Sequence, residues 1–216
     1  MKPILRTLRP LIAVIALCWI GHAAAASQKQ DDAADAQRLI EVLELRPGST
    51  VADVGAGSGP LTVLMARHVG PSGRVYATDI NADRLAELRK AAASASLSNV
   101  TVLEGRETET NLPDACCDAI FMRLVYHHFG DPPAMNASLM RSLKPGGRIA
   151  VVDFAPKRGD SAPPGKRADG DAHGVTPATV IEELKAAGFV DVGEQKWTPP
   201  GFLVIGRRPA APHPVN

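Results

Sequence analysis

The chain has 216 residues, a length typical of one domain built around a single hydrophobic core. Its composition is that of a globular protein, because 45% of the residues are hydrophobic and 22% are charged. The formal net charge is +1, but three of the basic residues lie in a segment that we expect to be removed, which leaves no basic footprint for nucleic acid. The sequence has no low-complexity tract or apparent internal repeat.

The first 26 residues have the pattern of a secretory signal peptide. Lys2, Arg6 and Arg9 form a positive region, residues 11–20 form an apolar stretch, and residues 24–26 offer the small residues of a cleavage site. The alternative is an uncleaved membrane anchor, but this apolar stretch is short for a span of about twenty residues. Cleavage would remove three of the 24 basic residues and none of the 23 acidic ones. The mature chain would then have 21 basic residues and a net charge of about −2. We therefore expect a periplasmic or secreted protein with no stable membrane span.

Two elements are expected at the start of the mature chain. Residues 31–45 predict an amphipathic helix, because apolar side chains recur on one face, and the Arg-Pro-Gly run at 46–48 ends it. Residues 50–54 then predict a short buried strand, introduced by the same turn residues.

A glycine-rich turn follows this strand. Gly55, Gly57 and Gly59 remove every second side chain, so the backbone can turn sharply and a ligand can approach it closely. Pro60 suits the first turn of a helix over residues 60–69, whose free N–H groups would face the turn. The stretch indicates a pocket for a nucleotide-type ligand.

The spacing of this turn argues against two common nucleotide sites. A dinucleotide fingerprint has glycine at the first, third and sixth places, but the sixth place after Gly55 is Pro60. A phosphate-binding P-loop is excluded because no Gly-Lys-Ser/Thr follows. Asp53 would repel a pyrophosphate and suits a ligand that carries an ammonium group.

The stretch from Asp53 to Gly59 resembles motif I of the class I S-adenosylmethionine-dependent methyltransferases, in which an acidic residue precedes a Gly-x-Gly-x-Gly turn. The resemblance implies that this segment cradles the amino-acid end of S-adenosylmethionine. The residues it assigns to the cofactor here are Asp53, Gly55, Ala56, Gly57 and Gly59.

Asp79 ends a second expected strand, residues 74–78, and lies 24 residues beyond Gly55. In a doubly wound sheet the carboxyl ends of neighbouring strands open onto one crevice, where a carboxylate can accept both hydroxyls of a ribose. The alternative is a helix cap, but Asn81 can cap the helix over residues 82–96 itself. The position matches the acidic motif II of the same class, so Asp79, with Ile80 beside it, is predicted to bind the cofactor.

The expected adenine contact departs from the family. After the third strand, residues 99–103, the resemblance would place Gly-Asp, whose Asp binds the adenine amino group. This chain has Gly105-Arg106 instead. Glu104 or Glu107 can substitute without matching the position, and we take Glu107 as the candidate.

Arg123 is a charge within the otherwise apolar fourth strand, residues 118–125. A buried charge needs a partner, so Arg123 is expected at the strand's open end. It occupies the place of the motif IV residue that borders the cofactor in related sequences. A structural salt bridge is the equal alternative.

His127 and His128 follow this strand where the crevice widens toward substrate, and the loop of residues 154–172 brings His173 back to face them. A histidine there can act as a general base or orient a substrate oxygen, so all three are catalytic candidates. However, transfer to an ionised nucleophile needs little beyond alignment. His173 has two alternatives: it can complete a three-histidine site for a substrate or a metal, or it can be a loop residue without a catalytic role. We expect the loop residue rather than the three-histidine site, and therefore no bound metal.

Cys116 and Cys117 give no zinc signal, because no paired histidines stand nearby. In an exported protein the two can form a vicinal disulfide or remain thiols. We expect Cys117 to pack in the core.

The rest of the chain completes an α/β pattern. A helix over residues 132–143, the Lys-Pro-Gly-Gly turn at 144–147 and a strand over 148–153 form a second resemblance to the same class. A helix over 176–187 and a hairpin over 190–205 follow. The class implies a three-layer αβα sandwich with a Rossmann-like seven-stranded sheet of order 3-2-1-4-5-7-6 and an antiparallel last strand.

We therefore predict a methyltransferase domain over residues 27–208 and a disordered tail over 209–216. The expected reaction is methyl transfer from S-adenosylmethionine to a small-molecule acceptor, with no nucleic-acid partner. A second hypothesis is an exported, non-catalytic protein of the same fold that binds an adenosyl ligand. A third, a nicotinamide oxidoreductase, is disfavoured by Pro60.

Overall fold

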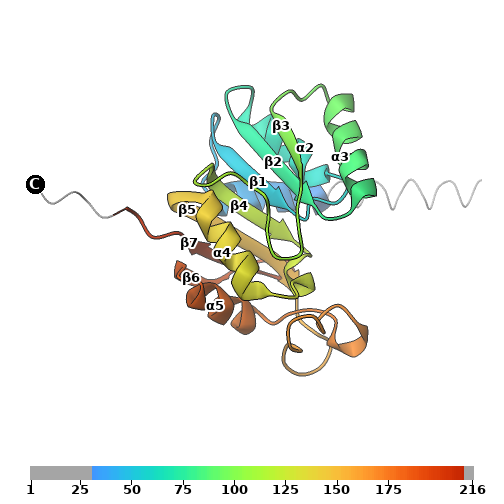
Figure 1. Cartoon of the computed structure of the whole chain (residues 1–216), viewed down its shortest axis with the longest axis vertical. Coiled ribbons are helices and arrows are strands. Elements are labelled where there is room, and N and C mark those ends of the chain that lie inside the picture. The colour runs from blue at the N-terminus through green and yellow to red at the C-terminus, as the bar shows by residue number, and fades with distance from the viewer. Residues whose placement is uncertain (1–30, 212–216) are drawn as a thin grey trace, which may run out of the picture.

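The structure is a computed structural model, and it describes residues 31–211 (Figure 1). The expected signal peptide therefore lies outside the described residues, as do residues 212–216 of the expected tail. Within the described range, no helix has both the length and the apolar character that a membrane crossing requires.

Seven strands form one sheet in the order β3-β2-β1-β4-β5-β7-β6 (Figure 1). The strands from β3 to β5 run parallel to one another, and β7 is antiparallel to both of its neighbours. This is the predicted order, including the antiparallel last strand. The strands are β1 (Thr50–Val54), β2 (Arg74–Asp79), β3 (Val100–Glu104), β4 (Cys117–Arg123), β5 (Leu143–Phe154), β6 (Val190–Gln195) and β7 (Gly201–Arg207).

Both faces of the sheet are buried by helices, which gives the predicted three layers. Side chains of a strand alternate between faces, so in β1 Val51 joins one core cluster while Ala52 and Val54 join the other. One cluster includes side chains of α4 and α5, and the other includes side chains of α2 and of a helix over residues 31–42. The remaining elements are α2 (Pro60–Val69), α3 (Ala82–Ser94), η1 (Tyr126–His128), α4 (Pro132–Ser142), η2 (Gly170–Ala172) and α5 (Pro177–Ala186).

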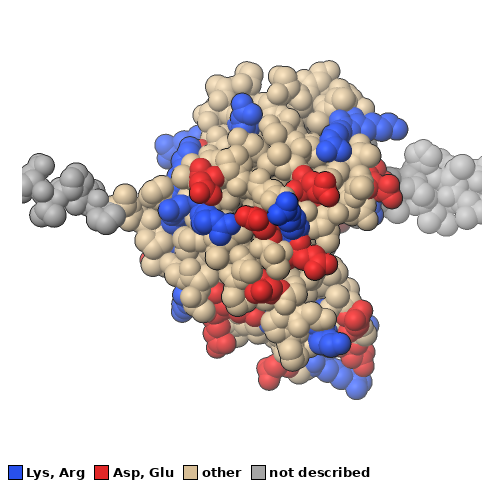
Figure 2. All heavy atoms as spheres, viewed as in Figure 1, with Lys and Arg blue, Asp and Glu red and all other residues tan. Residues whose placement is uncertain are grey.

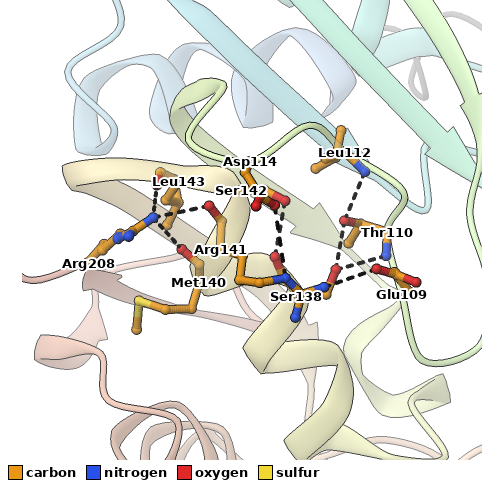
Figure 3. A network of polar contacts seen from close by, with 10 residues as sticks. All are labelled: Glu109, Thr110, Leu112, Asp114, Ser138, Met140, Arg141, Ser142, Leu143 and Arg208. Carbon is orange, nitrogen blue, oxygen red and sulfur yellow. Dashed lines mark hydrogen bonds and ion pairs between the residues drawn. The ribbon is translucent and has the colours of Figure 1, made fainter.

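The turn after α4 differs from its prediction. β5 begins at Leu143, so the Lys-Pro-Gly-Gly segment lies inside an irregular strand that shifts its register against β4. The end of α4 is held by Arg208, whose guanidinium donates hydrogen bonds to the carbonyls of Met140, Arg141 and Leu143 (Figure 3). A helix leaves its last carbonyls without backbone partners, so this arginine replaces the turn residues as the cap.

A second part of the same network ties α4 to the segment after β3. Thr110 donates its backbone N–H to Ser138 Oγ at 3.1 Å, and the two hydroxyls lie 3.0 Å apart (Figure 3). Arg141 forms an ion pair of 3.0 Å with Glu109. The segment around residues 105–112 is thereby fixed although it carries no helix or strand.

The long loop before α5 packs against the domain. Arg167 is only 3% exposed, and its guanidinium pairs with the Glu183 carboxylate at 2.6 Å and with the Ala162 carbonyl at 2.8 Å. This anchor explains why a segment rich in proline, glycine and charge is ordered around η2. Cys116 and Cys117 form a vicinal disulfide, and Cys117 is fully buried as predicted. Acidic and basic side chains are interspersed on the face that Figure 2 shows.

Candidate functional site

The glycine turn between β1 and α2 consists largely of residues with left-handed backbone conformation. Gly55, Gly57 and Gly59 have φ angles of +73°, +56° and +88°, which L side chains rarely adopt. A Cβ on Gly55 would lie 2.5 Å from Val125, so packing also requires glycine there. A Cβ on Gly57 would meet nothing within 4 Å. The backbone at Gly57 therefore faces open space, from which a ligand can reach it.

Asp79 joins this turn to the neighbouring strand. Its Oδ2 accepts a hydrogen bond from the Gly57 N–H at 2.9 Å, and its Oδ1 accepts one from the Asn81 N–H at 2.9 Å. The Asn81 side chain caps α3, as predicted, by accepting from the N–H groups of Asp83 and Arg84. A carboxylate offers about four acceptor sites, so Asp79 retains capacity for two hydroxyl groups of a ligand.

A cavity of about 740 Å³ lies at the carboxyl ends of β1, β2 and β4. Gly57, Asp79, Ile80 and Glu107 line it, and so does His128. This volume is in the usual range for small-molecule sites, which lie at such sheet edges in α/β folds. With Gly55, which also lines it, five predicted cofactor residues and one predicted catalytic residue share this cavity.

A smaller cavity of about 280 Å³ adjoins the first and shares Gly55, Gly57 and Leu124 with it. Asp53, Ala56 and Arg123 also line this smaller cavity. Gly59 lines neither cavity, because it serves as the N-cap of α2 and lies against α3. Its contribution is therefore to shape the turn rather than to contact a ligand from a cavity wall.

Asp53 is a buried acid beneath the glycine turn. It is 3% exposed, and its Oδ2 accepts a hydrogen bond of 2.6 Å from Thr62 Oγ1. Burial raises the pKa of Asp53 to about 7, although Thr62 and Arg123 oppose the shift. A cationic group placed in the smaller cavity would favour the ionised carboxylate.

Arg123 occupies the open end of β4, as predicted, and its partners come from the N-terminal helix. Its Nη2 lies 2.6 Å from Asp32 Oδ1 and its Nη1 lies 2.7 Å from Asp35 Oδ2. The salt bridge foreseen as one alternative is therefore present. Because Arg123 also borders the smaller cavity, the ion pairs join the N-terminal helix to the wall of the site.

Gly105 and Arg106, which stand where the resemblance would place Gly-Asp, both line the larger cavity. Arg106 is exposed, and its guanidinium lies 4.0 Å from the Glu109 carboxylate. Glu107 lines the cavity as predicted, together with Thr110. Thr110 is 1% exposed and was not foreseen, since its role depends on the contact with Ser138 on α4.

The three predicted histidines meet beside the larger cavity. His127 is buried, and its Nε2 lies 3.1 Å from the Nε2 of His173. The ring centroid of His128 lies 4.0 Å from that of His127, with the two rings tilted by 42°, and His128 lines the cavity. Partial burial lowers the pKa of His128, and the neighbouring His127 adds to the effect.

Asp153 orients this cluster and was missed as a functional residue. It is fully buried near the end of β5. Its Oδ1 lies 2.8 Å from His127 Nδ1, and its Oδ2 accepts from the His127 backbone N–H at 3.1 Å. The available signal was an acid at the end of an apolar strand, the same signal that identified Asp79.

Leu124 is a second unforeseen residue of the site. It has a φ angle of +60°, rare for a leucine, and its side chain is 50% exposed. It lines both cavities directly after β4. Strained backbone and exposed apolar surface often coincide at ligand sites, but neither leaves a signal in the sequence.

Residues 52–151 match a protein family described as "Methyltransferase domain". The chain is 32% identical over 183 residues to "Nocamycin O-methyltransferase" of Saccharothrix syringae, covering 74% of this chain and 65% of that protein. It is 35% identical over 117 residues to "Ubiquinone/menaquinone biosynthesis C-methyltransferase UbiE" of Vibrio cholerae, covering 54% of this chain and 45% of that protein. The chain thus spans less than two thirds of both relatives.

A solved structure extends the likeness over most of the chain. "A SAM dependent methyltransferase from Aquifex aeolicus" superimposes with a TM-score of 0.69 at 28% identity. The match covers 81% of this chain and 89% of that structure. Sequence and fold comparisons therefore agree on the region that holds the two cavities.

Proposed function

We propose that the chain is a class I S-adenosylmethionine-dependent methyltransferase and that it transfers the sulfonium methyl group to a small-molecule acceptor, as its likeness to methyltransferases in sequence and fold supports. The observation that carries this proposal is the junction of Gly57 and Asp79 on the wall of the 740 Å³ cavity. At this junction the Gly57 backbone, which a ligand can reach, lies beside the Asp79 carboxylate, which can still accept hydrogen bonds.

The ribose of S-adenosylmethionine binds at Asp79. Hydroxyl groups donate to a carboxylate in strong, charge-assisted hydrogen bonds, and the N–H groups of Gly57 and Asn81 hold this carboxylate in place. A preorganised acceptor binds its ligand with less entropic cost. Ile80, 62% exposed beside Asp79, offers apolar surface to the adenosine.

The methionine part of the cofactor extends along the glycine turn into the smaller cavity. Its ammonium group interacts with the ionised form of Asp53, and the cation's approach lowers the pKa of that buried acid. Two arginines, Arg84 and Arg123, line this cavity, and Arg123 suits the methionine carboxylate. Its pairing with Asp32 and Asp35 brings the N-terminal helix to this end of the cofactor.

The adenine ring lies toward Glu107. The family's Asp is replaced by Arg106, and both Glu107 and Glu109 line the cavity on this side. Glu107, the residue next to Arg106, can accept a hydrogen bond from the adenine amino group. Gly105 beside it leaves room for the ring, because a Cβ there would meet nothing closer than 3.7 Å.

The acceptor approaches from the histidine cluster. His128 lines the cavity, and His127 and His173 lie directly behind it. In the transfer, a lone pair of the acceptor forms the new bond to the methyl carbon while the carbon–sulfur bond breaks, which leaves S-adenosylhomocysteine. An acceptor that carries a proton must lose it, and the imidazoles of His127, His128 and His173 are the groups placed to assist.

We further propose that the mature protein is exported after cleavage near residue 26. The charged and apolar pattern of residues 1–26 supports this, and so does the Cys116–Cys117 disulfide, since disulfides persist in oxidising compartments. The mass of the protein recovered from the periplasm or medium tests the proposal. A chain that retains residues 1–26 and stays in the cytoplasm would contradict it.

Isothermal titration calorimetry of the purified chain tests the cofactor assignment. We expect S-adenosylmethionine and S-adenosylhomocysteine to bind with one-to-one stoichiometry, and NAD⁺ to give no saturable heat. Binding without methyl transfer to any hydroxyl, thiol or carbon-acid acceptor in a broad panel would instead favour a non-catalytic adenosyl-binding protein. Absence of saturable heat with both sulfur ligands would refute the methyltransferase proposal.

A further inference from the structure

Three imidazoles converge at the acceptor end of the larger cavity. His127, His128 and His173 each offer a ring nitrogen, and these nitrogens all lie within 4.8 Å of one another. The pair His127 Nε2 and His173 Nε2 is 3.1 Å apart. Two imidazoles that bind one tetrahedral zinc ion at 2.0–2.1 Å have nitrogens roughly 3.3 Å apart, so this pair already has the required spacing.

The buried Asp153 carboxylate sets the ring of His127 in the orientation of a metal ligand. A carboxylate can only accept at its 2.8 Å contact with Nδ1, so Nδ1 carries the proton and Nε2 presents a lone pair toward His173. Asp153 also accepts from the backbone N–H groups of His127 and Phe154, which fixes its own position. Ligand histidines in proteins usually donate their second nitrogen to such a carboxylate.

The position of His173 is set by its backbone. The next residue, Gly174, donates to the Arg167 carbonyl at 2.9 Å, and Val175 donates to the Phe154 carbonyl at 2.9 Å. A Cβ on Gly174 would lie 2.7 Å from the Phe154 carbonyl oxygen, so the chain passes close to the end of β5. The Phe154 ring then packs edge-on against His173 at 4.9 Å.

A hydrogen bond from His173 to His127 is the simplest alternative explanation of the 3.1 Å contact. It accounts for two of the three rings and leaves His128 without a role. His128 has no side-chain hydrogen bond to any described residue, yet its ring lies 4.0 Å from His127 and 6.3 Å from His173. The His128 side chain is exposed, and one of its ring nitrogens already lies within 4.8 Å of a ring nitrogen of each of the other two.

We propose that His127, His128 and His173 bind a divalent transition-metal ion with the chemistry of zinc. Neutral imidazoles favour zinc, copper and nickel over magnesium and calcium, which prefer oxygen ligands. Three protein ligands leave a fourth coordination position open, as in catalytic rather than structural zinc sites. His128 lines the cavity, so the open position faces the space assigned to the acceptor.

The proposed role of the ion depends on the proposed methyl transfer, whereas the proposal that the three histidines bind an ion does not. A hydroxyl or thiol group that takes the open position becomes more acidic and releases its proton to solvent. The resulting anion attacks the methyl carbon, and the sulfur departs with the electrons of the broken bond. Methyl transfer by this route conserves charge and needs no oxidant or reductant.

The test uses the purified chain without a histidine tag, stripped of metal and titrated with Co²⁺ and Zn²⁺. We expect one Co²⁺ to bind with the visible absorption of a four- or five-coordinate site, and Zn²⁺ to displace it. His173→Ala and His127→Ala should abolish this spectrum. His68→Ala is the matched control, because His68 binds only the Leu45 carbonyl in the described structure, and it should bind Co²⁺ as the wild type does.

Asp153→Asn separates the orienting role from the ligands, and we expect it to weaken Co²⁺ binding about 10–100-fold. Circular dichroism shows whether each variant is folded. Wild-type protein that binds no Co²⁺, or cluster variants that bind it as well as His68→Ala does, would overturn the inference. Titration of the same metal-free protein with S-adenosylhomocysteine distinguishes the two proposals. Binding of S-adenosylhomocysteine without Co²⁺ binding would refute the metal site alone. Binding of Co²⁺ without S-adenosylhomocysteine binding would refute the methyltransferase proposal alone.

Discussion

The cofactor end and the acceptor end of the larger cavity are built in different ways. The cofactor end consists of a turn that is continuous in sequence and one carboxylate, Asp79, from the adjacent strand. The acceptor end depends on side-chain contacts across the fold, such as Asp153 with His127 and His173 with His127. Under the proposed function, cofactor binding depends mainly on backbone geometry, whereas acceptor chemistry depends on a few long-range side-chain contacts. Substitutions should therefore affect the two ends separately.

Asp153→Asn should give the largest effect and confine it to the acceptor end. An amide can no longer accept from both the ring and the backbone of His127 as a carboxylate does, so the ring loses its fixed tautomer. We expect methyl transfer to fall by roughly 10²-fold, the scale of a lost acid–base contribution. Transfer from labelled S-adenosylmethionine to the best acceptor of a small-molecule panel measures it.

The affinity for S-adenosylhomocysteine should stay unchanged in this variant, because Asp153 lines neither cavity. Asp169→Asn, an exposed acid in the same loop region as His173, is the control and should keep wild-type turnover. An Asp153→Asn protein that loses cofactor affinity instead of turnover would show that the two ends are not separable.

Asp79→Ala should affect the cofactor end alone. The variant loses two charge-assisted hydrogen bonds to the ribose and frees the N–H of Gly57. Hydrogen bonds to charged groups contribute about 1.5–3 kcal/mol each, so the net loss of even one of them should weaken the binding of S-adenosylhomocysteine at least about tenfold in calorimetry. Asp83→Ala, at the exposed start of α3, should bind as the wild type does; equal losses in both variants would mean that Asp79 acts only through the helix.

Gly55→Ala and Gly57→Ala test two different roles of the glycine turn, packing against Val125 at Gly55 and ligand binding at Gly57. Both place a methyl group at positive φ, which costs roughly 1–2 kcal/mol. Gly55→Ala adds a clash with Val125 and should lower the unfolding temperature more. Gly57→Ala points its methyl group into open space, so it should lose cofactor affinity while its unfolding temperature drops less. Thermal unfolding and calorimetry distinguish them, and an unchanged affinity in Gly57→Ala would place the cofactor elsewhere.

Asp53 should make the stability of the folded protein depend on pH. Its pKa is about 7 in the folded protein and near 3.8 when exposed, so the folded state binds the extra proton between these values. Its contribution to stability is therefore full below about pH 4 and is lost as the pH rises through 7. The free energy of unfolding by urea, measured across this range, should fall less in Asp53→Asn than in the wild type. An identical slope in both proteins would contradict the shift.

The sequence predicted where the glycine turn and Asp79 lie because their signals are local. The positions of Asp53, the glycines and Asp79 follow from strand ends and turn chemistry, and the whole sheet order follows from the same pattern. The sequence could not show that Arg123 pairs with Asp32 and Asp35 or that Asp153 holds His127, because those partners are 26 to 91 residues apart. The sequence did not predict Leu124 as a site residue for another reason: the surrounding structure imposes its positive φ angle.

A crystal structure of the chain soaked with S-adenosylhomocysteine tests the central claim most directly. The account predicts ribose hydroxyls within hydrogen-bond distance of the Asp79 carboxylate, the homocysteine part along Gly55 and Gly57, and the sulfur facing His128. Clear density for the ligand away from Asp79, or an empty cavity at saturating ligand concentration, would contradict it.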